Sequence, residues 1–261
     1  MNILDQIIAQ KQLEVQQSKQ RTSFSELEQS PLFYRDVFSL SQFIKDPAKT
    51  GIIAEYKRKS PSKGIINDRS DVFEVTSAYA EHGASGLSVL TDGPFFGGNL
   101  HDLQAARPNA VPLLRKEFII DEYQLSEAKA HGADAILLIA ACLSPQRVKE
   151  LAKAARALAL EILLEIHDET ELGHICPEVN LVGVNNRNLK NFEVDLEHSI
   201  RLSEKIGSQL KIAESGIRSA ADIRFLKANG FDGFLIGEMF MKQSNPGAVF
   251  AGLVQELDQN I

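Results

Sequence analysis

Residues 52–57 read IIAEYK, so an apolar run leads into Glu55 and Lys57, which stand two positions apart. Strand side chains alternate between two faces, so both ionisable groups point the same way. A carboxylate and an ammonium are costly to bury together unless they pair. Four more apolar runs carry ionisable or amide side chains in the same manner, at 114–118, 163–166, 184–187 and 212–216. One such strand could hold a structural salt bridge, but five indicate one shared catalytic site.

Short apolar runs alternate with longer amphipathic segments from about residue 52 onward. The runs cover residues 52–57, 86–91, 112–118, 134–140, 160–166, 180–185, 210–214 and 232–237. The amphipathic segment from Ser144 to Leu158 opens with an N-cap serine and a first-turn proline, which is typical of a helix. Alternating strands and helices predict right-handed βαβ units and a parallel sheet. Eight such strands in 261 residues favour a closed (β/α)8 TIM barrel over an open sheet.

Residues 1–50 do not follow the barrel pattern. Ile3, Leu4, Ile7 and Ile8 recur at helical spacing, so we expect an N-terminal helical extension before a catalytic barrel at 51–261, the two forming one structural domain. A helical cap that closes the bottom of the barrel explains this segment as well as a lid over the mouth does. Spacing alone leaves both alternatives open.

Composition excludes several classes of protein. The net charge of −7 and the lack of a long basic stretch argue against nucleic-acid binding. We see no signal peptide and no window of about 18 apolar residues, so we expect a cytoplasmic protein without a membrane partner. Cys142 and Cys176 form no CxxC and are expected as buried, reduced thiols. No exposed apolar stripe demands a second subunit, so we expect a monomer.

Parallel barrels build their active sites at the carboxyl ends of their strands. In strand order, those ends offer Glu55 and Lys57, Thr91, Lys116, Cys142, Glu165, Asn185 and Arg187, Glu214 and Ser215, and Gly237 and Glu238. The small polar loop at 60–64, with Ser60 at its start, and the glycines that end strands seven and eight indicate a phosphorylated substrate. Four cations at the expected mouth suit an anionic ligand: Lys57, Lys63, Lys116 and Arg187.

Residues 54–64, AEYKRKSPSKG, resemble the signature of the indole-3-glycerol-phosphate synthase family. The resemblance extends through residues 87–91, 116–119, 183–189 and 213–217 and covers essentially the whole chain, including the N-terminal extension. It implies a carbon–carbon lyase of tryptophan biosynthesis that needs no metal or organic cofactor. It also implies the substrate 1-(2-carboxyphenylamino)-1-deoxyribulose 5-phosphate, which loses carbon dioxide and water. In that family the extension lies near the mouth.

The resemblance also implies roles for individual residues. Lys116 would be the acid at the substrate carbonyl, Glu165 would assist proton removal or dehydration, and Lys57 would act on the carboxylate or as a second acid. Glu55 and Glu214 would hold the lysines, Asn185 would hydrogen-bond a ribulose hydroxyl, and Arg187 would face the carboxylate. Phe96 and Phe118 would sandwich the anthranilate ring, with Leu137 or Leu138 behind it. The residues that would bind phosphate are Ser60, Ser215, Gly216, Gly237 and Glu238. Glu238 stands where some members carry serine, so it should point away from the anion.

Two alternatives stay open beside the synthase. Lys116 could be the covalent amine of a Schiff-base aldolase on the same fold, or the barrel could bind a phosphorylated metabolite without turning it over. The histidines are less informative, because no spacing reads as a metal site. His101, His174 and His198 are expected on the surface, and His167 in a loop rather than at the mouth.

Overall fold

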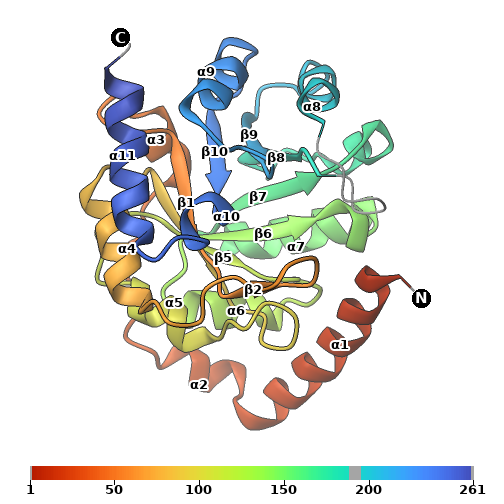
Figure 1. Ribbon diagram of the computed structural model, residues 1–261. Helices are drawn as coiled ribbons and strands as arrows, with labels where there is room; N and C mark the ends of the chain where they lie inside the picture. Colours follow the sequence, from red (N-terminus) through yellow and green to blue (C-terminus); the bar gives the residue numbers. More distant parts are fainter. Residues whose placement is uncertain (1, 188–194, 260–261) are drawn as a thin grey trace.

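Eight parallel strands close into a barrel in the computed structural model, which describes residues 2–187 and 195–259 (Figure 1). Each predicted apolar run contains one strand, and neighbours in the barrel follow chain order. The strands are β1 (Ile52–Tyr56), β4 (Gly86–Leu90), β5 (Leu113–Lys116), β6 (Ala135–Ile139), β7 (Glu161–Ile166), β8 (Leu181–Asn185), β9 (Leu210–Glu214) and β10 (Gly233–Ile236). β1 pairs with both β4 and β10, so the barrel leaves no free edge.

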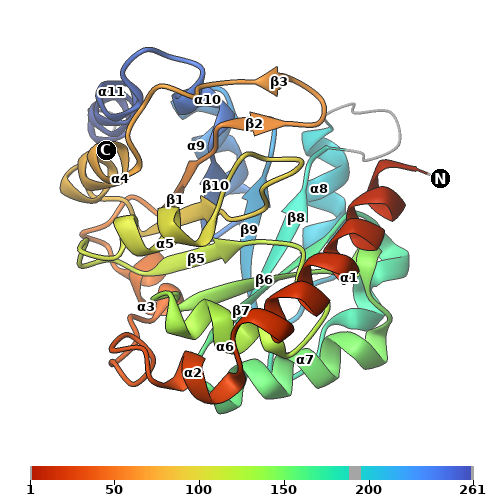
Figure 2. The same cartoon turned by 90° about the horizontal axis from the view of Figure 1, so that it is seen from below.

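Helices cover the outside of the barrel. They are α4 (Val72–Glu81), α5 (Leu100–Ala106), α6 (Tyr123–Ala130), α7 (Pro145–Ala157), α8 (Leu196–Ser203), α9 (Ala220–Ala228), α10 (Glu238–Met241) and α11 (Pro246–Asp258), with short 3-10 turns η1 (Ala140–Cys142) and η2 (Glu169–His174). Ser144 caps α7 as expected, with its side chain accepting from Arg147 N. The C-terminal helix α11 lies beside α4, so the two ends of the barrel sequence meet (Figures 1 and 2).

Alternation along each strand separates the core from the site. In β1, Ile53 points into an apolar layer inside the barrel, and Glu55, two residues later, reaches the open end. In β7, Leu163 and Glu165 repeat this arrangement. The residues between them face outward and pack beneath the helices. Each strand can therefore contribute both a core residue and a functional group.

The third helix of the extension seals the bottom of the barrel. The extension contains α1 (Ile3–Arg21), α2 (Phe24–Glu28) and α3 (Leu40–Lys45). Leu40 and Ile44 of α3 belong to the same apolar cluster as the inward residues of the strands. Gly86 and Gly233 make room for them, because an added Cβ would lie 2.6 Å from Leu40 Cδ1 and 2.9 Å from Ile44 Cδ1 respectively. This part of the extension is a bottom cap.

The first helix lies at the opposite end of the barrel. Ile3, Leu4 and Ile7 of α1 line the cavity at the carboxyl ends of the strands, and α1 contacts α6 (Figure 2). Lys11, further along α1, is buried and lies 3.1 Å from Asp92 Oδ2 and 3.0 Å from Glu117 Oε1. Both explanations of the extension therefore hold, each for a different helix.

Two smaller sequence expectations can be compared with the structure. Cys142 and Cys176 are free thiols, but both are half-buried rather than buried. Within residues 2–187 and 195–259, no helix is long and apolar enough to cross a membrane.

Replacing Leu40 with alanine tests the cap. Leu40 is fully buried, so L40A should lower the free energy of unfolding by about 2–5 kcal/mol through lost burial and a residual cavity. The measurement is urea unfolding followed by circular dichroism. Leu13 of α1 is mostly exposed, so L13A is the matched control and should cost less than about 0.5 kcal/mol. Equal effects of the two substitutions would show that α3 does not close the core.

Candidate active site

A cavity of about 770 Å³ opens at the carboxyl ends of the strands. It is lined by every residue to which the resemblance gives a role, except Leu138, the alternative to Leu137. These lining residues are Glu55, Lys57, Ser60, Phe96, Lys116, Phe118, Leu137, Glu165, Asn185, Arg187, Glu214, Ser215, Gly216, Gly237 and Glu238. They come from every barrel strand or the loop after it, which is the arrangement expected of a site shared by the whole barrel.

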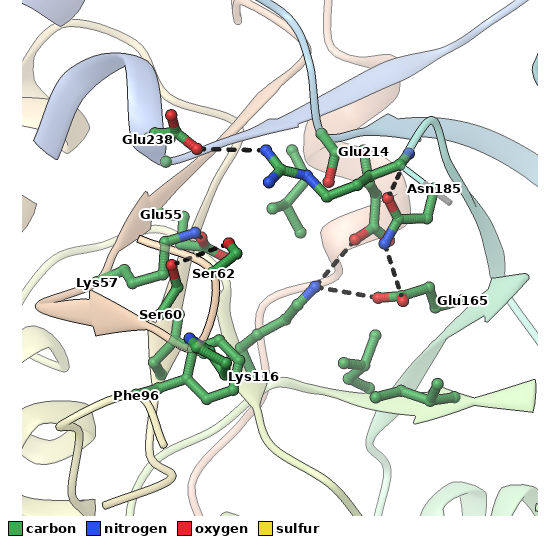
Figure 3. Close-up of a pocket in the computed structure, with 18 of the residues that line it drawn as sticks. Glu55, Lys57, Ser60, Ser62, Phe96, Lys116, Glu165, Asn185, Glu214 and Glu238 are labelled. Carbon is green, nitrogen blue, oxygen red and sulfur yellow. Dashed lines mark hydrogen bonds and ion pairs between the residues drawn. The ribbon is translucent and has the colours of Figure 1, made fainter. Parts of the chain in front are cut away.

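Lys116 lies at the centre of the charged groups (Figure 3). Its Nζ is 2.9 Å from Glu214 Oε2 and 3.3 Å from Glu165 Oε2. Asn185 Nδ2 donates to the other oxygen of Glu165 at 3.1 Å. One ammonium is therefore shared by two carboxylates that reach it from β7 and β9.

Lys57 forms a second, separate ion pair. Its Nζ donates to Glu55 Oε1 at 2.7 Å, and Ser88 Oγ donates to the other Glu55 oxygen at 3.4 Å. Glu55 and Glu214 thus each hold one lysine, as the resemblance implied. Lys57 keeps more contact with solvent than Glu55 does, because it stands beyond the end of β1.

Two glycines make these carboxylate positions possible. A Cβ on Gly183 would lie 2.0 Å from Glu214 Oε1, and a Cβ on Gly237 would lie 2.5 Å from Glu55 Oε1. Neither distance is compatible with a side chain in the present geometry. From the sequence, Gly237 was expected only as part of a phosphate site, and Gly183 had no predicted role of its own. Both residues have the additional role of leaving room for a buried glutamate.

Burial and shared charge shift the pKa values of the central cluster. For Lys116, burial alone would lower the pKa, but Glu214 and Glu165 outweigh burial and raise it well above the usual value. For Glu165, burial alone would raise the pKa, but Lys116, His167 and Asn185 hold it below its usual range. For Glu214, burial is the dominant cause and raises the pKa to about 7 despite Lys116. The two carboxylates on Lys116 therefore differ in their affinity for a proton.

The aromatic wall differs from the sandwich that we expected. Phe96 and Phe118 both line the cavity, but their ring centroids are 5.9 Å apart at an interplanar angle of 40°. A third ring between them would need a separation of about 7 Å, since stacked carbons approach to about 3.5 Å. A substrate ring can therefore pack against one side of the pair but not between the two rings as they stand. Leu137 lines the same cavity, whereas Leu138 points outward into the core beneath the helices.

The groups expected to bind phosphate also line the cavity. Ser60 lies in a short hairpin of β2 (Lys59–Ser60) and β3 (Gly64–Ile65) at the mouth. Ser215 and Gly216 both have positive φ, +67° and +73°, so the chain turns sharply after β9. A serine in this region stores strain of about 1–2 kcal/mol, which is common at functional sites.

Three of the four cations expected at the mouth line the cavity, and carboxylates outnumber them there. Lys57, Lys116 and Arg187 line it, but so do five glutamates: Glu55, Glu117, Glu165, Glu214 and Glu238. Arg187 pairs with Glu238 at 3.3 Å, and Lys63 stands outside the lining at 4.0 Å from Glu238. A phosphate group would therefore depend on backbone amides and hydroxyl groups more than on side-chain cations.

A few of the candidate positions lie elsewhere. Thr91 follows β4 outside the cavity and donates its hydroxyl to Glu117 Oε2. Cys142 lies in η1, also outside the lining. His174 is buried rather than on the surface, with Leu143 O 2.9 Å from Nε2. His167 is in a loop as expected, yet its ring contacts Glu165. Asn188 and Leu189, which belong to the family resemblance, lie outside the described residues.

Contacts behind the residues that line the cavity were not predicted from the sequence. Asp92 Oδ1 accepts from the amides of Phe95 and Phe96, and its Oδ2 faces Lys11 of α1. Lys11 thereby connects the N-terminal helix to the loop that carries Phe96. A single lysine in a polar helix gives no signal of this contact, because Asp92 is 81 residues away in the sequence.

The chain is similar to one family along nearly its whole length. A family model described as Indole-3-glycerol phosphate synthase matches residues 4–253. The Indole-3-glycerol phosphate synthase of Bacteroides thetaiotaomicron is 44% identical over 258 residues, which cover 98% of this chain and 99% of that protein. That of Bordetella pertussis is 40% identical over 259 residues, which cover 97% and 99%.

Solved structures of lower identity share the barrel. A mutant tryptophan synthase alpha-subunit from Pyrococcus furiosus aligns with a TM-score of 0.62 at 15% identity, covering 81% of this chain and 99% of that one. Tryptophan synthase subunit alpha from Legionella pneumophila aligns with a TM-score of 0.61 at 12% identity, covering 84% and 95%. At such identities the likeness is one of fold alone.

The raised pKa of Glu214 predicts a pH-dependent cost to stability. Glu214 binds its proton more tightly in the folded protein than in the unfolded chain, so its ionisation between about pH 4.5 and pH 7 disfavours folding. The substitution E214Q removes the ionisable group and, with it, this pH-dependent cost to folding. The stability of the wild type relative to E214Q should therefore fall by about 2–3 kcal/mol between pH 4.5 and pH 7.5, measured by urea unfolding.

An exposed carboxylate supplies the control for this experiment. Glu81 at the end of α4 is exposed, so E81Q should change stability by a similar small amount at both pH values. If the difference in the free energy of unfolding between wild type and E214Q does not vary with pH, the pKa of Glu214 is not raised in the folded protein.

Proposed function

The chain belongs to the indole-3-glycerol phosphate synthase family, and we propose that the cavity described above performs this reaction with Lys116 as the general acid. The enzyme is a decarboxylating carbon–carbon lyase of tryptophan biosynthesis. It converts 1-(2-carboxyphenylamino)-1-deoxyribulose 5-phosphate to indole-3-glycerol phosphate, carbon dioxide and water. The observation that supports the acid role is the position of the Lys116 ammonium between two buried carboxylates at the centre of the cavity.

The reaction needs an acid at more than one point. A ring carbon attacks the ribulose C2 carbonyl, whose oxygen gains a proton as the new carbon–carbon bond forms. The benzoate carboxylate then leaves as carbon dioxide, and a hydroxyl departs as water after it is protonated. Because the carboxylate leaves without a proton, each turnover consumes one proton from solution. The site must therefore hold protonated groups beside the substrate at neutral pH.

Lys116 suits the first protonation. Glu214 and Glu165 keep its pKa above the usual value, so the ammonium is fully charged before substrate binds. The carbonyl oxygen becomes alkoxide-like during the attack, and an alkoxide is a stronger base than an amine, so proton transfer from the ammonium remains favourable. A fixed ammonium also stabilises the negative charge that develops on that oxygen.

Glu165 is the candidate base, because its pKa is held low and its carboxylate is oriented by Lys116 and Asn185. It would take the proton that leaves the new ring before dehydration. The pair of Lys57 and Glu55, on the other side of the mouth, is available as a second acid for the departing hydroxyl or as a contact for the substrate carboxylate. Asn185 can exchange its contact with Glu165 for a ribulose hydroxyl.

The walls of the cavity support one orientation of the bound substrate. The anthranilate ring would pack on the shared face of Phe96 and Phe118, with Leu137 behind it. The phosphate would bind near Ser60 and the turns at 215–216 and 237–238, since backbone amides there can donate without adding charge. Arg187 would leave Glu238 to meet the substrate carboxylate, and Glu238 would then turn from the phosphate.

A Schiff-base aldolase is less consistent with the cluster. A covalent amine must lose its proton to act as a nucleophile, whereas the two carboxylates favour the charged form of Lys116. A barrel that only bound a metabolite for regulation would not require paired lysines and carboxylates, which are costly to bury. The acid role explains why this cost is tolerated.

We also infer the working context of the enzyme. A monomer is supported by the scattered positions of the large exposed apolar side chains, which are Ile3, Leu13, Phe24, Tyr34, Ile65, Phe73 and Phe225. The net charge of −7 disfavours nucleic acid as a partner. A biosynthetic role on a phosphorylated small molecule fits the cytoplasm, without a membrane partner.

The proposal is tested by turnover in wild type and in two lysine variants. The wild type should generate indole fluorescence from the carboxyphenylamino-deoxyribulose phosphate. K116M keeps the side-chain volume but removes the ammonium, so its kcat should fall at least about a hundredfold, the low end for a positioned acid, while KM changes much less. K57M, measured in parallel, reports on the second lysine.

Circular dichroism on both variants checks that they fold. A wild type without turnover would overturn the assignment of this cavity to the family reaction. Near-normal kcat in K116M together with a large loss in K57M would move the acid role to Lys57.

A further inference from the structure

The central cluster has too few cations if Lys116 is considered alone. Glu165 and Glu214 are both buried, and both contact the same ammonium. One ammonium can balance the charge of only one carboxylate, and a second buried carboxylate is costly without a partner of its own. Glu214 Oε1 has no hydrogen-bond partner among the described residues, whereas both oxygens of Glu165 are contacted. The two carboxylates therefore differ in what lies behind them.

His167 lies behind Glu165. It is the first residue after β7 and is not part of the cavity lining. Its Nε2 is 3.2 Å from Glu165 Oε1, its Nδ1 is 3.5 Å from Glu171 Oε2, and the side chain is 11% exposed. The backbone amide of His167 also donates to Glu171 Oε2 at 2.6 Å, which fixes the second carboxylate beside the ring. The imidazole is thus enclosed between two carboxylates, which favours its charged form.

Two other titratable groups near this ring, Cys142 and His198, do not supply a competing charge. Cys142 of η1 faces both Glu165 and Glu171, but burial and these carboxylates raise the pKa of its thiol, so it stays neutral. His198 of α8 meets the backbone of His167 and not its ring, with Nε2 3.0 Å from His167 O. For His167 itself, burial would lower the pKa, but Glu165 and Glu171 outweigh burial and raise it to about 10.

We propose that His167 is a positioning residue that, as a buried imidazolium, selects Glu165 rather than Glu214 as the ionised base of the cluster. The role of Glu165 as a catalytic base rests on the proposed function. The charge state of His167 does not depend on it. When Lys116 transfers its proton to the substrate, both carboxylates lose their shared cation. Glu165 keeps a second cation behind it and stays ionised. Glu214 has no second cation among the described residues, so it takes up a proton more readily.

The pH profile of the variant H167Q tests the kinetic part of the proposal. Glutamine keeps a polar group beside Glu165 but carries no charge, so the pKa of Glu165 should rise. The acidic limb of kcat against pH should move up by at least about one unit, so the loss of kcat should grow as the pH falls along that limb and be smallest at pH 9.

H198Q is the matched control, since it removes a neighbouring imidazole that touches only backbone. Its kcat should stay within about twofold of the wild type, with an unchanged profile. A uniform loss at all pH values in H167Q would mean a merely structural role for His167 and would overturn the proposal. So would a profile that superimposes on that of the wild type.

A titration without substrate tests the charge state directly. In protein labelled with ¹³C and ¹⁵N histidine, the ring signals that disappear in H167Q belong to His167. They should show an imidazolium to above pH 8, and E171Q should lower the midpoint by about one unit or more because it removes one of the two carboxylates. A midpoint near 6.5, the ordinary value, would overturn the proposal. Since this measurement needs no turnover, its failure is distinguishable from a failure of the synthase assay.

Discussion

The ammonium of Lys116 lies within 3.3 Å of two buried carboxylates, and this cluster constrains much of the surrounding structure. Charges in a low-dielectric interior are tolerated only where partners are held at short distance. The closed barrel supplies this rigidity, because each group stands on a strand bonded on both sides. Gly183 provides the space that Glu214 occupies. The packing of the barrel therefore determines the geometry of the charged groups in the site.

The N-terminal extension connects the two ends of this barrel. Leu40 and Ile44 of α3 fill the lower interior, so the extension shares the core of the strands. Lys11 of α1 instead pairs with Asp92 and Glu117 at the mouth. Because Asp92 also accepts from the amide of Phe96, α1 influences the aromatic wall of the site without contributing a catalytic group. The extension is thus a cap at one end of the barrel and a support for the active site at the other.

The sequence predicted what depends on local spacing. Inward positions two residues apart placed Glu55 and Lys57 on one face of a strand, and the structure shows them paired. The family signature supplied the remaining site residues, and the cavity brings them together. What could not be predicted depends on distances between segments far apart in the chain. Gly183 beside Glu214 and the separation of Phe96 from Phe118 are both set by tertiary packing.

The most direct test is a crystal structure with an unreactive substrate analogue whose ketone is reduced to an alcohol. The account predicts the C2 hydroxyl within about 3 Å of Lys116 Nζ, which is hydrogen-bond reach. It also predicts the anthranilate ring against Phe96 and Phe118, and the phosphate on the turns at 215–216 and 237–238. An analogue bound in the cavity with its C2 hydroxyl on Lys57 and away from Lys116 would contradict the central role of the buried ammonium.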